Sequence, residues 1–392
     1  MNRLHIAFFG PTNSGKSTLV NALAGQQVSL VSPIPGTTTD PVRKLIELPG
    51  LGPCVLIDTA GLGDGSALGA ERERMTRAII DETDIAVILE TPEVSPMSPN
   101  EGHWQQKPGE NDANVPDFGT LAAQAGIPII RYTRGESVES LLERLVAAAP
   151  QEEERFLTGH LVRKGSSVLL VMPQDSEAPK GRLILPQVQV LRELLDRGCV
   201  PHSCTPDSLQ AAMASLSGRP DLVITDSQVF SLVDRSIPKD WPLTSFSVLL
   251  AAAKGDVKTF VAGARAIDSL QPGSRVLIAE ACTHVPDTED IGRVKIPALL
   301  RKKMADQVGH DGGVVMPGST GHLLRIDIAA GNDFPEDLSP YSLIIHCGAC
   351  VANARLVRSR IRKALLAGVP ITNYGIALAE LSGILGRIAI PD

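Results

Sequence analysis

Gly10-Pro-Thr-Asn-Ser-Gly15-Lys16-Ser17 decides the fold of the N-terminal part of the chain, because it matches the phosphate-binding loop pattern in full. That pattern needs a strand before it and a helix after it, and here it lies between the apolar run Leu4–Phe9 and a helical pattern over Ser17–Ala24. The glycines let backbone N–H groups turn toward phosphates, and the helix N-terminus adds positive potential. We therefore predict a nucleotide-phosphate site made by Gly10, Asn13, Ser14, Gly15, Lys16, Ser17 and Thr18.

Two later segments supply further contacts to Mg²⁺ and the γ-phosphate. Asp58-Thr-Ala-Gly61 closes an apolar run, as expected for a carboxylate that holds Mg²⁺ through water and a glycine whose N–H meets the γ-phosphate. The Ser17 hydroxyl suits the same Mg²⁺. Pro35–Asp40 resembles the switch I segment of Era and TrmE-like GTPases, and this resemblance implies Thr38 as a further Mg²⁺ contact. The spacing of these segments is typical of a GTPase rather than an ATPase.

Three other positions bear on the nucleotide and its hydrolysis. Potassium-dependent members of the Era and TrmE-like class carry an asparagine at the position of Asn13, so the resemblance implies K⁺ beside the phosphates. Leu62 stands where Ras-like proteins have a water-orienting glutamine, so GTP hydrolysis should be slow without another group or partner. The guanine-reading Asn-Lys-x-Asp is absent after the Pro128–Ile130 run, where the chain has Arg131-Tyr-Thr-Arg134-Gly-Glu136. Phosphate binding is therefore predicted, whereas guanine specificity stays open beside the alternative of a degenerate nucleotide domain.

The composition is that of an ordinary globular protein, with 392 residues of which 43% are hydrophobic and 21% charged. A net charge of −7 argues against a general attraction to nucleic acid or to an anionic membrane. No apolar run approaches the roughly 20 residues of a spanning helix, and the sequence starts with a strand-like run rather than a basic leader. We expect a cytoplasmic protein without a membrane or nucleic-acid partner. Six cysteines, three of them from Cys282 to Cys350, favour metal binding over a disulfide framework.

Apolar strand-like runs alternate with helical stretches along the chain, which predicts an α/β protein. Residues 1–157 should form a P-loop GTPase-like domain with a parallel sheet, and two smaller α/β domains should follow over residues 158–259 and 260–392. The expected strands include Leu4–Phe9, Val55–Ile57, Ile85–Leu89, Pro128–Ile130, Val168–Met172, Leu222–Ile224, Val276–Ala279, Leu343–Ile345 and Val369–Thr372. The expected helices include Ser17–Ala24, Val138–Ala149, Val188–Asp196 and Val351–Ala367.

Cysteine and histidine gather in two short segments of the last part, Cys282-Thr-His284 and His346-Cys347-Gly-Ala-Cys350. Each follows an apolar strand, so both can meet at the carboxyl ends of neighbouring parallel strands, where α/β sheets place their ligands. Cys350 also stands directly before the expected Val351–Ala367 helix, whose dipole would favour a thiolate. Three cysteines with one histidine suit tetrahedral Zn²⁺, and three cysteines also suit a 4Fe-4S cluster with one open iron. Residue types alone therefore leave both metals open.

These metal segments, behind a GTPase-like domain, resemble the HydF family of FeFe-hydrogenase maturation GTPases. The likeness covers essentially the whole chain, although the spacer between the metal segments is longer than usual. It extends over Glu177–Gln187, Arg275–Cys282, Asp290–Pro297 and Gly368–Gly375.

The resemblance implies a middle domain that makes a homodimer and a last domain that holds a 4Fe-4S cluster on Cys282, Cys347 and Cys350. It also implies an exchangeable fourth group on the cluster. His284 and His346 are the candidates for that position, although a histidine beside metal cysteines can instead serve behind the ligands.

By the same resemblance, the protein is a scaffold that receives a di-iron precursor from two radical maturation enzymes and hands it to apo-FeFe-hydrogenase. Two other hypotheses stay open. One is an Era or TrmE-like GTPase switch that acts on RNA or the ribosome and carries a structural zinc. The other is a structural dimer with a decayed nucleotide site. The acidic composition and the lack of a basic, aromatic-bearing tract count against the RNA hypothesis.

Overall fold

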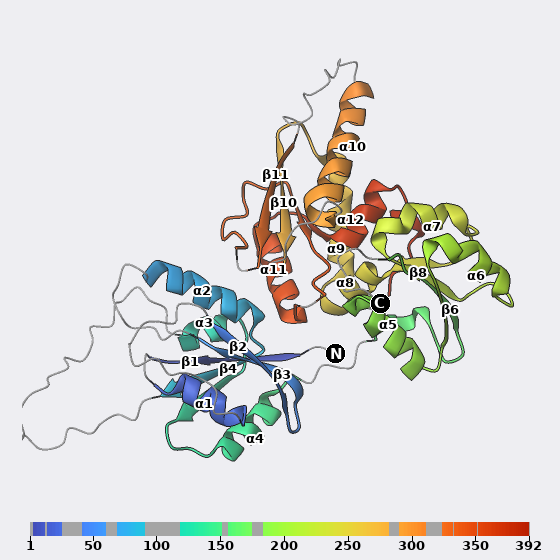
Figure 1. Cartoon of the computed structure of the whole chain (residues 1–392). Coiled ribbons are helices and arrows are strands. Elements are labelled where there is room, and N and C mark those ends of the chain that lie inside the picture. The colour runs from blue at the N-terminus through green and yellow to red at the C-terminus, as the bar shows by residue number, and fades with distance from the viewer. Residues whose placement is uncertain are drawn as a thin grey trace, which may run out of the picture. The chain divides into compact units, whose positions relative to one another are not determined.

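The computed structural model describes two compact units, Met1–Glu152 and Glu153–Asp392, each built from strands flanked by helices (Figure 1). Among the helices of the described residues, none combines the length and the apolar character that a bilayer span requires. The described residues are 3–11, 14–25, 41–59, 69–90, 118–150, 156–174, 183–281, 290–310, 324–331, 333–350 and 352–391.

The N-terminal unit has, over its described residues, a five-stranded sheet in the order β2-β3-β1-β4-β5. Four strands run parallel, and the edge strand β2 pairs with β3 in the antiparallel sense. The central strands read as continuous apolar runs because both faces of the sheet are covered. The elements are β1 (Leu4–Phe9), α1 (Lys16–Leu23), β2 (Val42–Leu48), β3 (Gly52–Asp58), α2 (Gly69–Glu82), β4 (Ile85–Glu90), α3 (Phe118–Gln124), β5 (Ile129–Thr133) and α4 (Val138–Ala148).

Helices pack on both faces of this sheet (Figure 1). On one face, α1 and α4 bury Val20 and Leu145 against Phe8 of β1. On the other face, α2 and α3 bury Ile79 and Ala122. Because the faces are occupied, the carboxyl edge of the strands is left to the connecting loops, and the phosphate loop follows β1 there.

The second unit has, over its described residues, two four-stranded parallel sheets in the orders β7-β6-β8-β9 and β11-β10-β12-β13. In each sheet, the first strand along the chain lies between the second and the third, so one topology occurs twice. The elements around the first sheet are η1 (Gly159–Leu161), β6 (Ser167–Val171), α5 (Leu185–Asp196), β7 (Val200–Cys204), η2 (Pro206–Ser208), α6 (Leu209–Ser215), β8 (Leu222–Thr225), η3 (Ser227–Val229), α7 (Phe230–Ser236), β9 (Leu243–Ser245) and α8 (Phe246–Lys254). Those around the second are α9 (Val257–Ala264), η4 (Arg265–Ser269), β10 (Ser274–Glu280), the π-helical η5 (Ile291–Lys295), α10 (Ile296–His310), β11 (Leu324–Ala330), β12 (Leu343–His346), α11 (Ala354–Leu366), β13 (Ile371–Asn373), α12 (Tyr374–Leu381) and η7 (Leu385–Arg387).

The two sheets of this unit share one hydrophobic core, to which β8 contributes Val223 and β12 contributes Ile344. They are also joined where α8 and α12 begin, each directly after the last strand of its sheet. The Asn373 side chain caps α12 and donates from Nδ2 to the Ser247 carbonyl and hydroxyl oxygens, each at 3.2 Å. The second unit is therefore one packed body with two sheets.

The α/β class expected from the sequence is confirmed, and each expected strand overlaps an observed one. Four edge strands, β2, β7, β9 and β11, were not predicted, because none of them has a long continuous apolar run. The last predicted long helix begins at Ala354 rather than Val351. Asn353 caps it, since its Oδ1 accepts the Leu356 N–H at 3.0 Å. Cys350 thus lies in the preceding loop, and the expectation that a helix dipole acts directly on its thiolate was wrong.

A glycine in α9 makes the close approach of this helix to β13 possible. A Cβ atom on Gly263 would lie 2.0 Å from the carbonyl oxygen of Ile371, well inside van der Waals contact. We expect Gly263→Ala to lower the free energy of unfolding by about 1–3 kcal/mol, because the helix must move away from the strand. Urea unfolding followed by circular dichroism measures this change. Gly218→Ala, at an exposed position with open space around it, is the control, and an equal effect of both substitutions would contradict the packing argument.

Candidate functional site

The phosphate loop lies between β1 and α1, as the sequence predicted. Gly15 has φ +96° and directly precedes α1, and a Cβ on Gly10 would lie 3.0 Å from both the Leu89 carbonyl oxygen and the Ser14 hydroxyl. Only glycine fits both requirements without strain. Lys16 is buried and donates from Nζ to the carbonyl oxygens of Gly10 at 3.0 Å and Pro11 at 2.8 Å. Two backbone carbonyl groups at the start of the loop therefore bind the Lys16 ammonium group.

Asp58 ends β3 opposite Phe8 of β1, next to the loop. Burial raises the pKa of its carboxyl group, while a hydrogen bond with Ser17 and the charge of Lys16 oppose that rise. Burial likewise lowers the pKa of Lys16, and Asp58 opposes that shift. Asp58 Oδ1 and Ser14 Oγ are buried without a hydrogen-bond partner among the described residues. Buried polar atoms of this kind need a partner, and Mg²⁺ with a nucleotide phosphate fits this donor and acceptor set.

The predicted residues Asn13, Thr38 and Gly61 lie outside the described residues. The phosphate site is therefore described through Gly10, Ser14, Gly15, Lys16, Ser17, Thr18 and Asp58.

The segment after β5, where a guanine-reading motif would stand, is tied to the protein itself. Glu136 lies three residues after Thr133, the spacing at which the motif carries its aspartate. Glu136 Oε1 forms an ion pair with Arg144 and accepts a hydrogen bond from the Ser140 hydroxyl at 3.0 Å. Arg144 also donates to the Arg131 carbonyl oxygen at 2.8 Å. The sequence analysis assigned no role to Glu136, although its spacing of three residues from Thr133 could have indicated one.

The carboxyl ends of β10 and β12 meet side by side in the second unit, as predicted for the metal segments. Ala279 pairs with His346, and the Cys347 N–H donates to the Ala279 carbonyl oxygen at 2.9 Å. Cys347 Sγ accepts N–H groups from Ala281 at 3.1 Å and from Ala349 at 3.4 Å. Backbone donors of this kind favour the thiolate form of cysteine.

His346 is fully enclosed at this edge. Its Nδ1 lies 2.8 Å from the Cys347 carbonyl oxygen, and its Nε2 lies 3.2 Å from Arg360 Nη1. Because a guanidinium can only donate, Nε2 is the acceptor and Nδ1 carries the proton. Burial and the charge of Arg360 lower the pKa of His346 to about 3. The ring is neutral, and both of its nitrogens have partners within the protein.

A buried ionic network lies beside the two strand ends. Glu280, the last residue of β10, is 1% exposed and accepts from Arg293 Nη2 at 2.7 Å. Arg293 belongs to the π-helical turn η5, and the side chain of Asp290, which caps this turn, accepts the Arg293 backbone N–H at 2.8 Å. Tyr374 Oη is buried near these charges with no hydrogen-bond partner among the described residues. Burial raises the pKa of Tyr374, so its hydroxyl keeps its proton and is a donor.

Lys254 is a functional candidate that the sequence reading missed. It ends α8, is 8% exposed, and donates from Nζ to three carbonyl oxygens of the loop that carries Cys347 and Cys350. Burial lowers the pKa of Lys254, while the charges of Cys350 and Cys347 oppose that shift. The signal in the sequence is a lysine at the end of an otherwise uncharged helix, Phe246–Lys254.

Of the predicted metal ligands, Cys282 and His284 lie outside the described residues. Within the part of the chain that is described, no three His, Cys, Asp or Glu side chains are grouped to hold a metal ion. His346 ends β12, and Cys347 and Cys350 lie in the loop that follows it. The donor types and the N–H groups around Cys347 fit a thiolate-bound metal or cluster.

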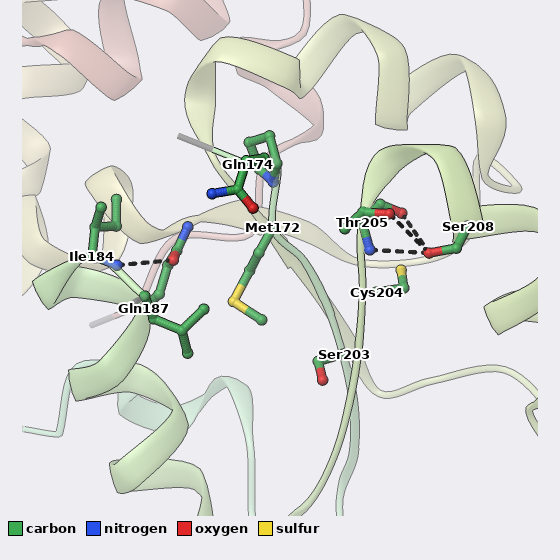
Figure 2. Close-up of a pocket in the computed structure, with 10 residues that line it drawn as sticks. Met172, Gln174, Ile184, Gln187, Ser203, Cys204, Thr205 and Ser208 are labelled. Atoms are coloured by element: carbon green, nitrogen blue, oxygen red, sulfur yellow. Dashed lines mark hydrogen bonds between the residues drawn. The ribbon is translucent and has the colours of Figure 1, made fainter. Parts of the chain in front are cut away.

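A separate cavity of about 380 Å³ lies at the carboxyl ends of β6 and β7 (Figure 2). Gln187 of α5 forms one wall, and its Oε1 accepts the Ile184 N–H at 3.2 Å. The opposite wall carries Cys204, Thr205 and Ser208. Cys204, which the sequence did not assign to a site, is one of the residues that line this cavity.

Comparison with known families covers nearly the whole chain. Residues 157–255 match the family described as Hydrogen maturase F dimerization domain. Residues 258–313 and 314–391 match the Hydrogen maturase F tetramerization domain. The chain belongs to the HydF family. Residues 5–115 of this HydF chain match the family described as 50S ribosome-binding GTPase, so its N-terminal unit is a GTPase-type domain.

The curated relatives resemble the N-terminal unit of this HydF chain. The tRNA modification GTPase MnmE of Methylobacterium sp. (strain 4-46) is 40% identical over 149 residues, which are 37% of this chain and 32% of that protein. MnmE of Granulibacter bethesdensis is 33% identical over 164 residues, 40% of this chain and 36% of that protein. The chain thus spans about a third of the length of these relatives.

Solved structures are more distant from the HydF chain. Aquifex aeolicus Era bound to GDP and AlF4⁻ is 14% identical, with a TM-score of 0.26 over 94% of this chain and 99% of that one. NFeoB from S. thermophilus bound to GDP, AlF4⁻ and K⁺ is 16% identical, with a TM-score of 0.21 over 37% of this chain and 62% of that one.

We expect this HydF chain to bind GTP and ATP with affinities within about tenfold of each other. The aspartate that normally reads guanine is missing, and Glu136 is held by Arg144 and Ser140. Competition of unlabelled GTP and ATP against a fluorescent GTP analogue measures the ratio. A preference for GTP of a hundredfold or more would contradict this expectation, and Glu136→Ala would then show whether Glu136 contacts the base.

Proposed function

We propose that this HydF-family chain is a scaffold and carrier in FeFe-hydrogenase maturation, with a 4Fe-4S cluster held by Cys282, Cys347 and Cys350. The hydrogen bond from the Ala281 N–H to Cys347 Sγ, 3.1 Å long, is the observation that carries the proposal. It joins the sulfur of one metal segment to the residue directly before Cys282, the start of the other segment. The strand that leads to Cys282 therefore ends beside the Cys347 sulfur, which supports a shared inorganic core.

The chemistry of the edge suits this role. When bound, the cluster supplies an iron with an exchangeable coordination position, at which a di-iron precursor is held and released. The Ala281 and Ala349 N–H groups stabilise negative charge on Cys347, and the Glu280–Arg293 pair fixes the end of β10. The proposed precursor comes from two radical maturation enzymes and passes to apo-FeFe-hydrogenase.

The two candidate histidines receive different roles in this proposal. Both nitrogens of His346 have partners inside the protein, which favours a positioning role behind Cys347 over ligation of iron. His284 is thereby preferred as the histidine candidate for the exchangeable position.

The N-terminal unit is proposed to bind GTP with Mg²⁺ through Lys16, Ser17, Thr38 and Asp58, and K⁺ beside Asn13. Its proposed task is to adjust partner binding rather than to perform assembly chemistry. Hydrolysis should be slow because Leu62 stands in place of a water-orienting glutamine. Slow hydrolysis suits a domain that adjusts partner binding. The proposed domains are residues 1–157, 158–259 and 260–392. The middle domain makes a homodimer, and the proposed location is the cytoplasm, where thiols stay reduced.

Metal analysis of anaerobically purified protein tests the cluster directly. We expect a brown protein that absorbs visible light and contains about four iron and four sulfide per chain. A colourless protein with stoichiometric zinc and no sulfide would refute the carrier proposal. That outcome would favour a GTPase with a structural zinc site.

Substitutions separate the metal site from the nucleotide site. Cys347→Ser should abolish cluster retention and hydrogenase maturation while leaving nucleotide affinity unchanged, whereas Cys204→Ser, on the cavity wall of the middle sheet, should retain the cluster. Lys16→Ala should weaken nucleotide binding by about 10- to 100-fold, the value of a charge-assisted contact, and leave the iron content intact. Visible absorption and fluorescent-nucleotide titration give both readouts, and persistence of the cluster in Cys347→Ser would remove the ligand assignment.

A further inference from the structure

The ammonium group of Lys254 makes three hydrogen bonds to a single loop. Its Nζ donates to the carbonyl oxygens of Ala349 at 2.7 Å, Cys350 at 3.1 Å and Ala352 at 2.9 Å. A lysine ammonium has three N–H donors, and a neutral amine has only two. The three bonds together therefore require the charged form of this buried side chain.

Within the same loop, the backbone N–H and carbonyl groups of Ala349 point in opposite directions. The Ala349 N–H points to Cys347 Sγ at 3.4 Å, while the Ala349 carbonyl points to Lys254. This arrangement needs a left-handed backbone at Ala349, whose φ is +49°. Such a conformation is costly for alanine and persists only where the surroundings impose it. Lys254 supplies that constraint, because three carbonyl oxygens converge on its charge.

Lys254 also crosses between the two sheets of the second unit. It ends α8, the helix that follows β9 of the first sheet, whereas the loop follows β12 of the second sheet. Lys254 lies within the residues that match the dimerization domain, and the loop lies within those that match the tetramerization domain. Through this contact, a lysine from a helix of the first sheet places its ammonium group beside the cysteine loop of the second sheet.

We propose that Lys254 is a positioning residue for the thiolate site. It holds the Cys347–Cys350 loop in shape and places its ammonium group behind that loop. This inference rests on the proposed cluster function for its electrostatic part. A buried positive charge favours the more negative, reduced state of a bound cluster. Lys254 thus sets both the conformation of the Cys347–Cys350 loop and the reduction potential of a cluster bound there.

Two readouts test this role separately. In the metal-free full chain, Lys254→Met should speed hydrogen exchange of the amides in residues 347–350 by about tenfold or more, because the loop loses its anchor. In the cluster-loaded full chain, the same variant should lower the reduced-to-oxidised ratio at a fixed potential about tenfold, a negative shift of about 59 mV for one electron. Lys254→Arg, which keeps the charge, should retain most of the wild-type potential.

Lys258→Met is the matched control, because Lys258 is exposed on the neighbouring helix α9, and it should leave both readouts unchanged. If Lys254→Met does not fold by circular dichroism, Lys254→Gln, which keeps two donors without the charge, replaces it in both measurements. Wild-type exchange rates and potential in the neutral variant would overturn the inference. If the wild-type chain binds no cluster, the proposed function fails, and the exchange experiment alone decides whether Lys254 orders the loop.

Discussion

Arg360 holds the ends of three parallel strands together at the proposed metal edge. It donates to the Glu280 carbonyl at the end of β10, to the Gly331 carbonyl just after β11, and lies 3.2 Å from His346 Nε2 at the end of β12. Its guanidinium also lies 4.8 Å from the centre of the Phe334 ring, so the charge is covered by an aromatic face. Arginine suits this place because its donors form a rigid planar fork.

Everything else at this edge follows from that arrangement. With Nε2 accepting from Arg360, the proton of His346 lies on Nδ1 and is directed to the Cys347 carbonyl. The β10 and β12 ends stay in register, so the Ala281 N–H reaches the Cys347 sulfur. Lys254 then secures the far side of the loop through its carbonyl groups. Two buried cations thus shape a segment whose proposed ligands are anionic.

The nucleotide site and the proposed metal edge follow one principle in two separate units. Each lies at the carboxyl edge of a parallel sheet, where loops with N–H groups and polar side chains converge. In the first unit, the positive groups are Lys16 and the start of α1. In the second unit they are Arg360 and Lys254, and the proposed ligand is a thiolate-bound metal instead of a phosphate. The cavity beside Cys204 lies at the corresponding edge of the third parallel sheet.

The sequence by itself determined the α/β class, the phosphate loop and the two cysteine segments, because apolar runs and short motifs are local properties of the chain. The tertiary structure alone decided the roles of Lys254, Arg360 and Glu136, since each acts on residues distant in the sequence or engaged by side chains that no motif records. The structure also shows that α11 begins at Ala354, after Cys350, because the Asn353 side chain caps this helix. Long-range hydrogen bonds depend on how sheets pack against each other, and no local pattern carries that information.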